Sequence, residues 1–342
     1  MLRGFCRRVS CAARGAARPG LVIVASIVLA WVPPVPSAAA TRDPSGVTVG
    51  HNLAASVSAF YVALDRGFFA EEGLKLQLVL MQGSAMTQAT LSGDIQFGTA
   101  FSSGANAAAR GAPVKVVIGL MAKPVFTLYV RPDRKIASVR DLRGKKLGVT
   151  RIGAGTDSAA RAILKHYGLV PDRDVTILTI GVGPSLVAAL QTGVIDAASL
   201  FPPHSFKAEK LGMVKLAYLG DLFELPASGI FTSEAVIRKQ RPLLKQFLRA
   251  AVRGMWYFLD ERNKADVVRV LTGMLKEDPE VAEASYRFIR AGHTTDGIPS
   301  ATGLRNYLDL ELGSSARAIT VEQVFDAGPL REVLAELRAS KG

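Results

Sequence analysis

The spacing of apolar residues switches between two periods from Gly46 to Phe101. Alternation every second residue predicts strands, and recurrence every three to four residues predicts helices. Strands are expected at Gly46–Leu53, Leu74–Leu80 and Ile95–Thr99, with helices at 57–66, from Gly83 to Gly93, and after Ser102. Strand and helix thus alternate three times in about 60 residues, which is typical of a parallel sheet flanked by helices.

Small hydroxylated residues stand where each of these helices should begin. In a parallel sheet, ligands bind beyond the carboxyl ends of the strands, where helix N-termini offer free N–H groups to an anion or polar group. The candidate ligand-binding residues of this half are His51, Asn52, Ser56, Ser58, Gly83, Ser84, Phe101 and Ser102. For His51 the alternative is a hydrogen-bonded core histidine, and for Phe101 it is core packing.

A family resemblance is carried by the run Phe60-Tyr61-Val62-Ala63, Gly67-Phe68-Phe69, Glu72-Gly73-Leu74, Gly83 and Leu91-Ser92-Gly93-Asp94-Ile95. This run resembles the opening of periplasmic solute-binding proteins of the nitrate/sulfonate/taurine family of ABC importers, together with related thiamine-precursor binders. One departure is Gln96, where the family usually carries an acid. The resemblance implies an α/β, two-lobed periplasmic binding protein fold of type II, in which each lobe is a mainly parallel sheet flanked by helices.

The remaining pattern fits two lobes joined by two hinge crossings. An extended run at Val125–Arg131 is the first crossing, and a second lies near Asp221–Ser228. We expect one lobe from residues 41–127 and 224–342, with mostly helical structure after the second crossing and a helix that starts near Pro242. The other lobe is expected at 128–223. The two halves echo each other faintly, because Gly93, Ile95 and Gln96 recur as Gly193, Ile195 and Asp196.

The second half offers a glycine-rich turn, Gly153-Ala154-Gly155, between a predicted strand and a helix. It fails as a dinucleotide site, because Ser158 stands where a third glycine is expected and Ile180-Gly181 stands where the ribose-binding acid belongs. A helix N-terminus that faces the cleft is the better interpretation, with Gly155, Thr156 and Asp157 as ligand-binding candidates and Arg151 as the nearest cation. Simple helix capping is the alternative for Thr156 and Asp157. Phe201 completes the candidates, since Pro202 forces extended backbone there, and core packing is the alternative for this ring.

The first 40 residues have the features of a secretory signal peptide. Five arginines precede the 12-residue apolar run Leu21–Val32, and Ala38-Ala39-Ala40 offers a cleavage site. A membrane span is the alternative, but Pro33 and Pro34 end the run short of the roughly 20 residues needed. Both cysteines, Cys6 and Cys11, lie in this leader, so we expect no disulfide, thiolate or lipid anchor in the mature protein.

Net charge and the motifs that the sequence lacks reduce the number of possible function classes. Loss of the leader lowers the formal net charge from +13 to +8, and the remaining cations are dispersed, which argues against nucleic-acid binding. The four histidines lack metal-ligand spacing, and no nucleophile elbow or phosphate loop occurs. We therefore predict a monomeric periplasmic receptor, without cofactor, metal or catalytic residues, that delivers a small solute to the membrane subunits of an ABC permease. The alternatives are an enzyme on the same fold, related to thiamine-pyrimidine synthesis, and a sensory domain.

Overall fold

The computed structural model describes residues 46–340. The predicted signal peptide, with Cys6 and Cys11, lies outside these residues. Within residues 46–340, ten strands form two five-stranded sheets. Their bounds are β1 (Gly46–His51), β2 (Lys75–Leu80), β3 (Phe97–Gly98), β4 (Val114–Met121), β5 (Thr127–Val130), β6 (Lys146–Val149), β7 (Thr176–Thr179), β8 (Ala197–Leu200), β9 (Val214–Tyr218) and β10 (Ser228–Ser233).

The helices alternate with the strands up to β10 and then dominate the chain. They are α1 (Ser58–Asp65), α2 (Phe68–Glu71), α3 (Gly83–Ser92), α4 (Phe101–Ala109), α5 (Gly155–His166), α6 (Gly183–Thr192), α7 (His204–Lys210), α8 (Glu234–Lys239), α9 (Arg241–Leu259), α10 (Lys264–Leu275), α11 (Pro279–Gly292), α12 (Ala301–Leu312), α13 (Val321–Val324) and α14 (Gly328–Ala339). Short 3₁₀ helices lie at Ala55–Val57, Pro132–Arg134, Val139–Leu142, Leu219–Asp221, Glu261–Asn263 and Gly313–Ala318. None of these described helices is long and apolar enough to cross a membrane.

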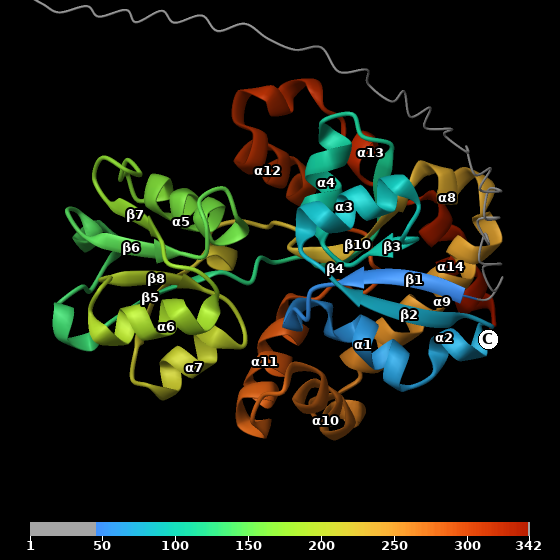
Figure 1. The fold of residues 1–342 in the computed structure, drawn as a ribbon, viewed down its shortest axis with the longest axis horizontal. Coiled ribbons are helices and arrows are strands. Elements are labelled where there is room, and N and C mark those ends of the chain that lie inside the picture. Colours follow the sequence, from blue (N-terminus) through green and yellow to red (C-terminus); the bar gives the residue numbers. More distant parts are fainter. Residues whose placement is uncertain (1–45, 341–342) are drawn as a thin grey trace, which may run out of the picture. The chain divides into compact units, whose positions relative to one another are not determined.

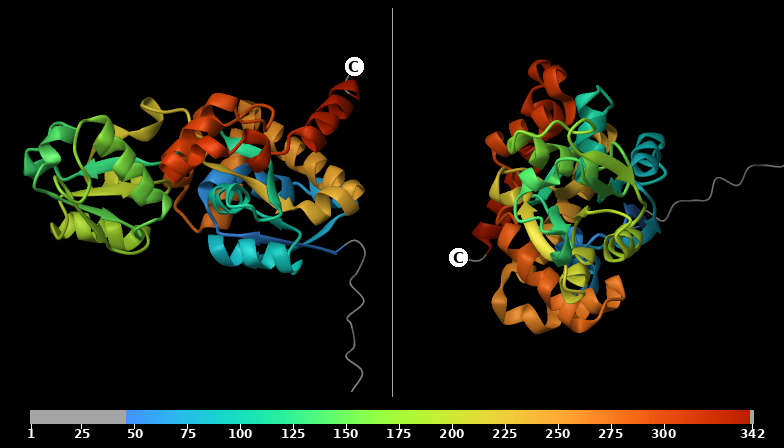
Figure 2. Two further views of the ribbon diagram at one scale, coloured as in Figure 1. Left: turned by 90° about the horizontal axis from the view of Figure 1, so that it is seen from above. Right: turned by 90° about the vertical axis from the view of Figure 1, so that its left-hand side faces the viewer.

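The two sheets share one topology. Sheet A has the order β2-β1-β3-β10-β4 and sheet B the order β7-β6-β8-β5-β9. In each sheet four strands run in one direction, while β10 in sheet A and β5 in sheet B run against their neighbours. The mainly parallel α/β architecture expected from the sequence is therefore confirmed. Segments coloured green to yellow gather around sheet B, and the blue, cyan, orange and red segments gather around sheet A (Figures 1 and 2).

The chain passes from sheet A to sheet B after β4 and returns after β9. The first strand after each passage runs antiparallel to its neighbours in the sheet that it joins. This strand is β5 after the first passage and β10 after the second. The chain after the second crossing is mostly helical, as expected, but the sequence analysis did not anticipate β10, which is a central strand of sheet A. Residues of β10 are buried on both faces, so they show no alternation that would mark a strand. The lobe boundaries at 127/128 and 223/224 remain a prediction.

Aromatic packing joins the long helix α9 to sheet A and to α1. The ring of Phe247 on α9 stacks on Phe97 of β3 at a centroid separation of 3.8 Å. Phe60 and Phe69 also pack on Phe247. Pro242 lies in the first turn of α9, as expected for a residue without a backbone N–H. This core fixes the carboxyl ends of β1 and β3, and with them the loops that follow.

Candidate functional site

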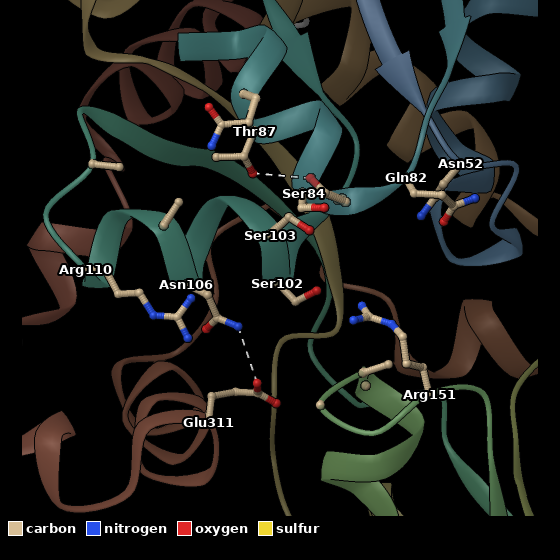
Figure 3. Close-up of a pocket in the computed structure, with 18 of the residues that line it drawn as sticks. Asn52, Gln82, Ser84, Thr87, Ser102, Ser103, Asn106, Arg110, Arg151 and Glu311 are labelled. Atoms are coloured by element: carbon tan, nitrogen blue, oxygen red, sulfur yellow. Dashed lines mark hydrogen bonds between the residues drawn. The ribbon is translucent and has the colours of Figure 1, made fainter. Parts of the chain in front are cut away.

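A cavity of about 610 Å³ lies at the carboxyl ends of strands from both sheets (Figure 3). Its walls come from the segments that follow β1, β2, β3 and β6, with one side chain from α12. The lining residues are Asn52, Gln82, Gly83, Ser84, Thr87, Gln88, Leu91, Ala100, Ser102, Ser103, Asn106, Ala107, Arg110, Ala112, Arg151, Gly153, Ala154, Gly155 and Glu311. This is the location that an α/β sheet favours for a ligand.

Three helices begin at this cavity. The lining includes the first residues of α3, α4 and α5, and none of the three carries a side-chain N-cap hydrogen bond. Among the other described helices, α8, α11, α12 and α13 are each capped by a Ser, Asp or Thr side chain, whereas α1, α6, α9, α10 and α14 also lack such a cap. The first amides of α3, α4 and α5 therefore present donors and the positive ends of helix dipoles to the cavity.

Two arginines add positive charge to the same walls. Arg151 extends from the loop after β6 toward the start of α4, and Arg110 lies at the other end of α4 (Figure 3). Within residues 46–340, neither guanidinium has a hydrogen bond or an ion pair. Most other arginines of this part of the chain are paired with carboxylates, as Arg161 is with Asp157 and Asp172. Arg110 and Arg151 are thus available to an anionic ligand.

Glu311 of α12 is the acid of the cavity wall. Asn106 donates a hydrogen bond to its carboxylate at 3.3 Å, and the Tyr307 hydroxyl donates to the Asn106 side-chain oxygen at 3.1 Å. Burial, and next the charge of Glu311, raise the pKa of Tyr307, so its hydroxyl keeps its proton. This network joins α12 to α4 and holds Asn106 in one orientation.

Five of the predicted ligand residues meet at this cavity. Asn52, Gly83, Ser84, Ser102 and Gly155 all line it, and so does Arg151. Gly83 allows a close approach, because an added Cβ would lie 2.1 Å from the Ser103 hydroxyl. The structure brings these residues together from segments that lie up to 103 residues apart in the sequence, from Asn52 to Gly155.

Thr156 and Asp157 lie beneath the cavity wall. The Thr156 hydroxyl accepts a hydrogen bond from the Thr150 N–H at 3.0 Å, and the Asp157 carboxylate accepts one from the Gly153 N–H at 2.8 Å. Asp157 also pairs with Arg161 at 2.7 Å. Both side chains are buried and hold the loop that carries Arg151, so they do not reach the cavity.

The remaining predicted residues also lie elsewhere. His51, Ser58 and Phe101 are buried: His51 contacts the Tyr61 hydroxyl, Ser58 donates to a backbone carbonyl, and Phe101 packs edge-on against Tyr307. Ser56 and Phe201 border a separate small pocket. The ring of Phe201 contacts Phe126 and His204 edge-on.

Several lining residues were missed by the sequence analysis. Asn106 and Arg110 follow Ser102 at intervals of four, so a polar stripe on one helical face could have revealed them. Glu311 lies more than 200 residues from Ser102 and gives no local signal. Among the described residues, no group of three or more His, Cys, Asp or Glu side chains could hold a metal ion.

Residues 54–265 of this chain match the sequence profile of the NMT1/THI5-like family, and this range includes most of both sheets. The chain belongs to the NMT1/THI5-like family. Some proteins that are similar in sequence to this chain are named as binding proteins. It is 26% identical to the riboflavin-binding protein RibY of Chloroflexus aurantiacus over 253 residues, which are 69% of this chain and 71% of RibY. It is 32% identical to the taurine-binding periplasmic protein of Escherichia coli over 170 residues, 49% of this chain and 52% of that protein.

Other relatives of this family member are named as enzymes. The 4-amino-5-hydroxymethyl-2-methylpyrimidine phosphate synthase of Aspergillus parasiticus is 31% identical over 161 residues, 46% of this chain and 43% of the synthase. Proteins named as binding proteins and proteins named as synthases are thus both similar to this chain.

Solved structures of periplasmic binding proteins have the same fold as this NMT1/THI5-like chain. The aliphatic sulphonate binding protein SsuA of Escherichia coli superposes with a TM-score of 0.70 at 19% identity, covering 85% of this chain and 92% of SsuA. The nitrate-binding protein NrtA of Synechocystis PCC 6803 superposes with a TM-score of 0.70 at 13% identity, covering 86% of this chain and 89% of NrtA. The two-lobed binding-protein fold expected from the resemblance is thus confirmed.

Proposed function

We propose that this chain is the periplasmic solute receptor of an ABC importer and that its solute is an organic anion such as a sulfonate or a carboxylate. The observation that carries the proposal is the convergence of three uncapped helix N-termini and two unpaired arginines on one cavity. Anions bind at helix N-termini through the first N–H groups and the dipole, and arginine adds charge-assisted hydrogen bonds.

The size and edges of the cavity favour an organic anion over a bare oxyanion. A volume of about 610 Å³ lies within the range of pockets that hold drug-sized molecules. Leu91, Ala100, Ala107 and Ala112 contribute apolar surface to the lining. Leu53 and Ile152, which adjoin cavity residues on opposite sheets, are 39% and 55% exposed. These aliphatic groups would contact the substituent of a ligand whose anionic group faces the helix starts.

Hinge closure is the step that would report ligand binding to the permease. Two connections join the sheets, and the cavity has lining residues from the segments that follow strands of both sheets. One proposed lobe consists of residues 41–127 and 224–342, and the other of residues 128–223. A ligand therefore gains all its contacts only when these two lobes approach each other. Such a ligand shifts the population toward the closed state. The closed receptor would then dock, as a monomer, on the membrane subunits. This role calls for no cofactor and no reaction.

A thermal-shift panel tests the proposal. The purified protein is heated with nitrate, taurine, butanesulfonate, benzenesulfonate, succinate, riboflavin and a pyrimidine. A ligand at 100 times its dissociation constant adds about 2.7 kcal/mol of stability, which raises Tm by several degrees. The proposal predicts such a shift for a sulfonate or a carboxylate. A shift with riboflavin or the pyrimidine alone would assign the cavity to a heterocycle.

Ligand recovery separates a receptor from an enzyme. A receptor returns its ligand chemically unchanged after prolonged incubation, whereas an enzyme on this fold would convert it. Mass spectrometry of the bound compound after release by denaturation gives the answer, and a product peak would contradict the receptor.

A further inference from the structure

A smaller hollow, which we call the side chamber, adjoins the cavity at the starts of α4 and α5. Its volume is about 70 Å³. It has Ser102, Gly155 and Glu311 in common with the cavity, and Ser102 and Gly155 belong to the first turns of α4 and α5. Its apolar walls include Phe126, Ala159, Leu219, Leu225, Ala227 and Leu310. An anion held at these two helix starts therefore lies at the border between the cavity and the side chamber.

One wall of the side chamber is formed by the two crossings between the sheets. Phe126 belongs to the first crossing, and Leu219, Leu225 and Ala227 belong to the second. The Leu219 N–H donates a hydrogen bond to the Phe126 carbonyl at 3.0 Å, which joins the crossings to each other. The Ala227 N–H donates to the Met121 carbonyl at the end of β4 at 3.3 Å. Backbone hydrogen bonds thus hold this wall independently of a ligand.

The other walls come from α5 on one side and from α4 and α12 on the other. Ala159 lies on α5 and Leu310 on α12. A Cβ added at Gly155 would lie 2.8 Å from the ring of Phe126, so glycine allows α5 to begin directly against that ring. Because α5 belongs to the proposed lobe 128–223 and α4 and α12 belong to the other, the side chamber closes around its contents when the lobes approach each other.

The size and polarity of the side chamber determine what it can hold. An engineered apolar cavity of about 150 Å³ in another protein holds benzene, so a volume of about 70 Å³ has room for roughly three carbon atoms. The Tyr307 hydroxyl at its wall already lies 3.3 Å from the Ser102 carbonyl and 3.1 Å from the Asn106 side-chain oxygen. The Glu311 carboxylate, which borders both hollows, repels a second acidic group on a ligand.

We propose that the side chamber determines which substituent the ligand carries. The anionic group lies at the starts of α4 and α5, and an unbranched aliphatic tail of about three further carbon atoms enters the chamber. This inference rests on the proposed receptor function and narrows the ligand class to short-chain aliphatic monoanions. A dianion such as succinate is disfavoured by Glu311, and an aromatic ring is larger than the chamber.

Calorimetric titration with unbranched alkanesulfonates, from methanesulfonate to octanesulfonate, tests the chamber. Each added methylene should tighten binding about fourfold up to butanesulfonate, and each further methylene should add less than about twofold. Benzenesulfonate should bind more weakly than butanesulfonate. A gain that continues evenly to octanesulfonate would overturn the proposal.

Ala227→Leu places a larger side chain in the chamber. This variant should bind butanesulfonate at least about tenfold more weakly than the wild type, while its affinity for methanesulfonate should change less than about twofold. Ala122→Leu is the matched control, because Ala122 is half-buried beside β4 and lines neither hollow. Equal losses for the two sulfonates in Ala227→Leu would contradict a role in substituent choice.

Xenon gives an answer that needs no ligand and no variant. Dry apolar cavities bind xenon, so wild-type crystals under xenon pressure should show an atom among Leu219, Leu225 and Leu310. Ordered water in its place would overturn an apolar chamber. If neither alkanesulfonates nor alkanoates bind, the receptor proposal fails and this inference fails with it. If they bind with affinities that do not depend on chain length, this inference alone fails.

Discussion

Gln96 and Asp196 lie a hundred residues apart and make the same hydrogen bond in the two sheets. The Gln96 side chain accepts from the Thr48 N–H of β1 at 2.8 Å, and the Asp196 side chain accepts from the Lys146 N–H of β6 at 3.0 Å. Each follows a glycine with left-handed backbone, Gly93 or Gly193, that ends the preceding helix. The faint sequence echo thus corresponds to one repeated structural device, and glutamine replaces the usual acid without loss of the bond.

Replacement of Gln96 tests this device. Gln96→Ala leaves the Thr48 N–H without its partner and should lower the free energy of unfolding by about 1–2 kcal/mol. Gln96→Glu keeps an acceptor oxygen and should change it by less than about 0.5 kcal/mol. Urea unfolding measures both. Equal losses in the two variants would show that the acceptor at this position does not matter.

Two helical glycines should respond to alanine in opposite ways. A Cβ added at Gly254 of α9 would lie 2.4 Å from the Ala63 Cβ of α1 and 2.6 Å from a backbone oxygen, whereas one added at Gly273 of α10 meets nothing within 4 Å. Gly254→Ala should destabilise by about 1–3 kcal/mol through overpacking. Gly273→Ala should stabilise by about 0.5–1 kcal/mol because alanine favours the helix. Thermal unfolding compares them, and a change of the same sign in both would contradict the close α1–α9 contact.

The sequence predicted the elements whose apolar pattern is periodic, and missed two neighbouring strands of sheet A that are buried on both faces, β4 and β10. β1, β2, α3 and α9 were expected close to their observed bounds. β4 was missed because nearly all of its residues are buried, so the polar alternation that marks a half-exposed strand is absent. β10 was missed for the same reason.

The site was predicted in part, and the limit has a physical cause. Small residues after predicted strands indicated the starts of α3, α4 and α5. The free backbone amides at these positions were predictable, because a helix start exposes its first N–H groups whatever the tertiary packing is. Which hydroxyl faces the cavity depends on tertiary packing: Ser84 and Ser102 line it, while Thr156 turns inward to bond the Thr150 N–H. The position of Glu311 depends on how α12 packs on α4, which no local pattern contains.

Stability should fall in mild acid because of buried His293. Burial lowers the pKa of His293 to about 4, below the ordinary value of 6.5. Between these values the unfolded chain binds the proton more readily, so stability is complete above about pH 6.5 and is lost as the pH falls toward 4. The loss from this group is on the order of 3 kcal/mol. Urea unfolding at pH 7.5, 5.5 and 4 should show a smaller slope for His293→Gln, while His166→Gln, at an exposed position, should follow the wild type.

Arg151 should contribute to ligand affinity from the sheet B side. Arg151→Gln removes a charge-assisted hydrogen bond and should weaken binding of a sulfonate by roughly 10- to 100-fold, with little change in Tm of the free protein. Arg140→Gln is the matched control, an exposed arginine that does not line the cavity. Comparable losses in both variants would indicate a general charge effect instead of a contact in the cavity.

The most direct measurement is calorimetric titration of the purified protein with butanesulfonate and with its uncharged counterpart, butanesulfonamide. Three amide clusters and two arginines around one cavity predict saturable one-to-one binding of the anion, at least tenfold tighter than binding of the amide. Equal affinities for the two compounds, or no heat of binding with either one, would contradict an anion receptor at this cavity.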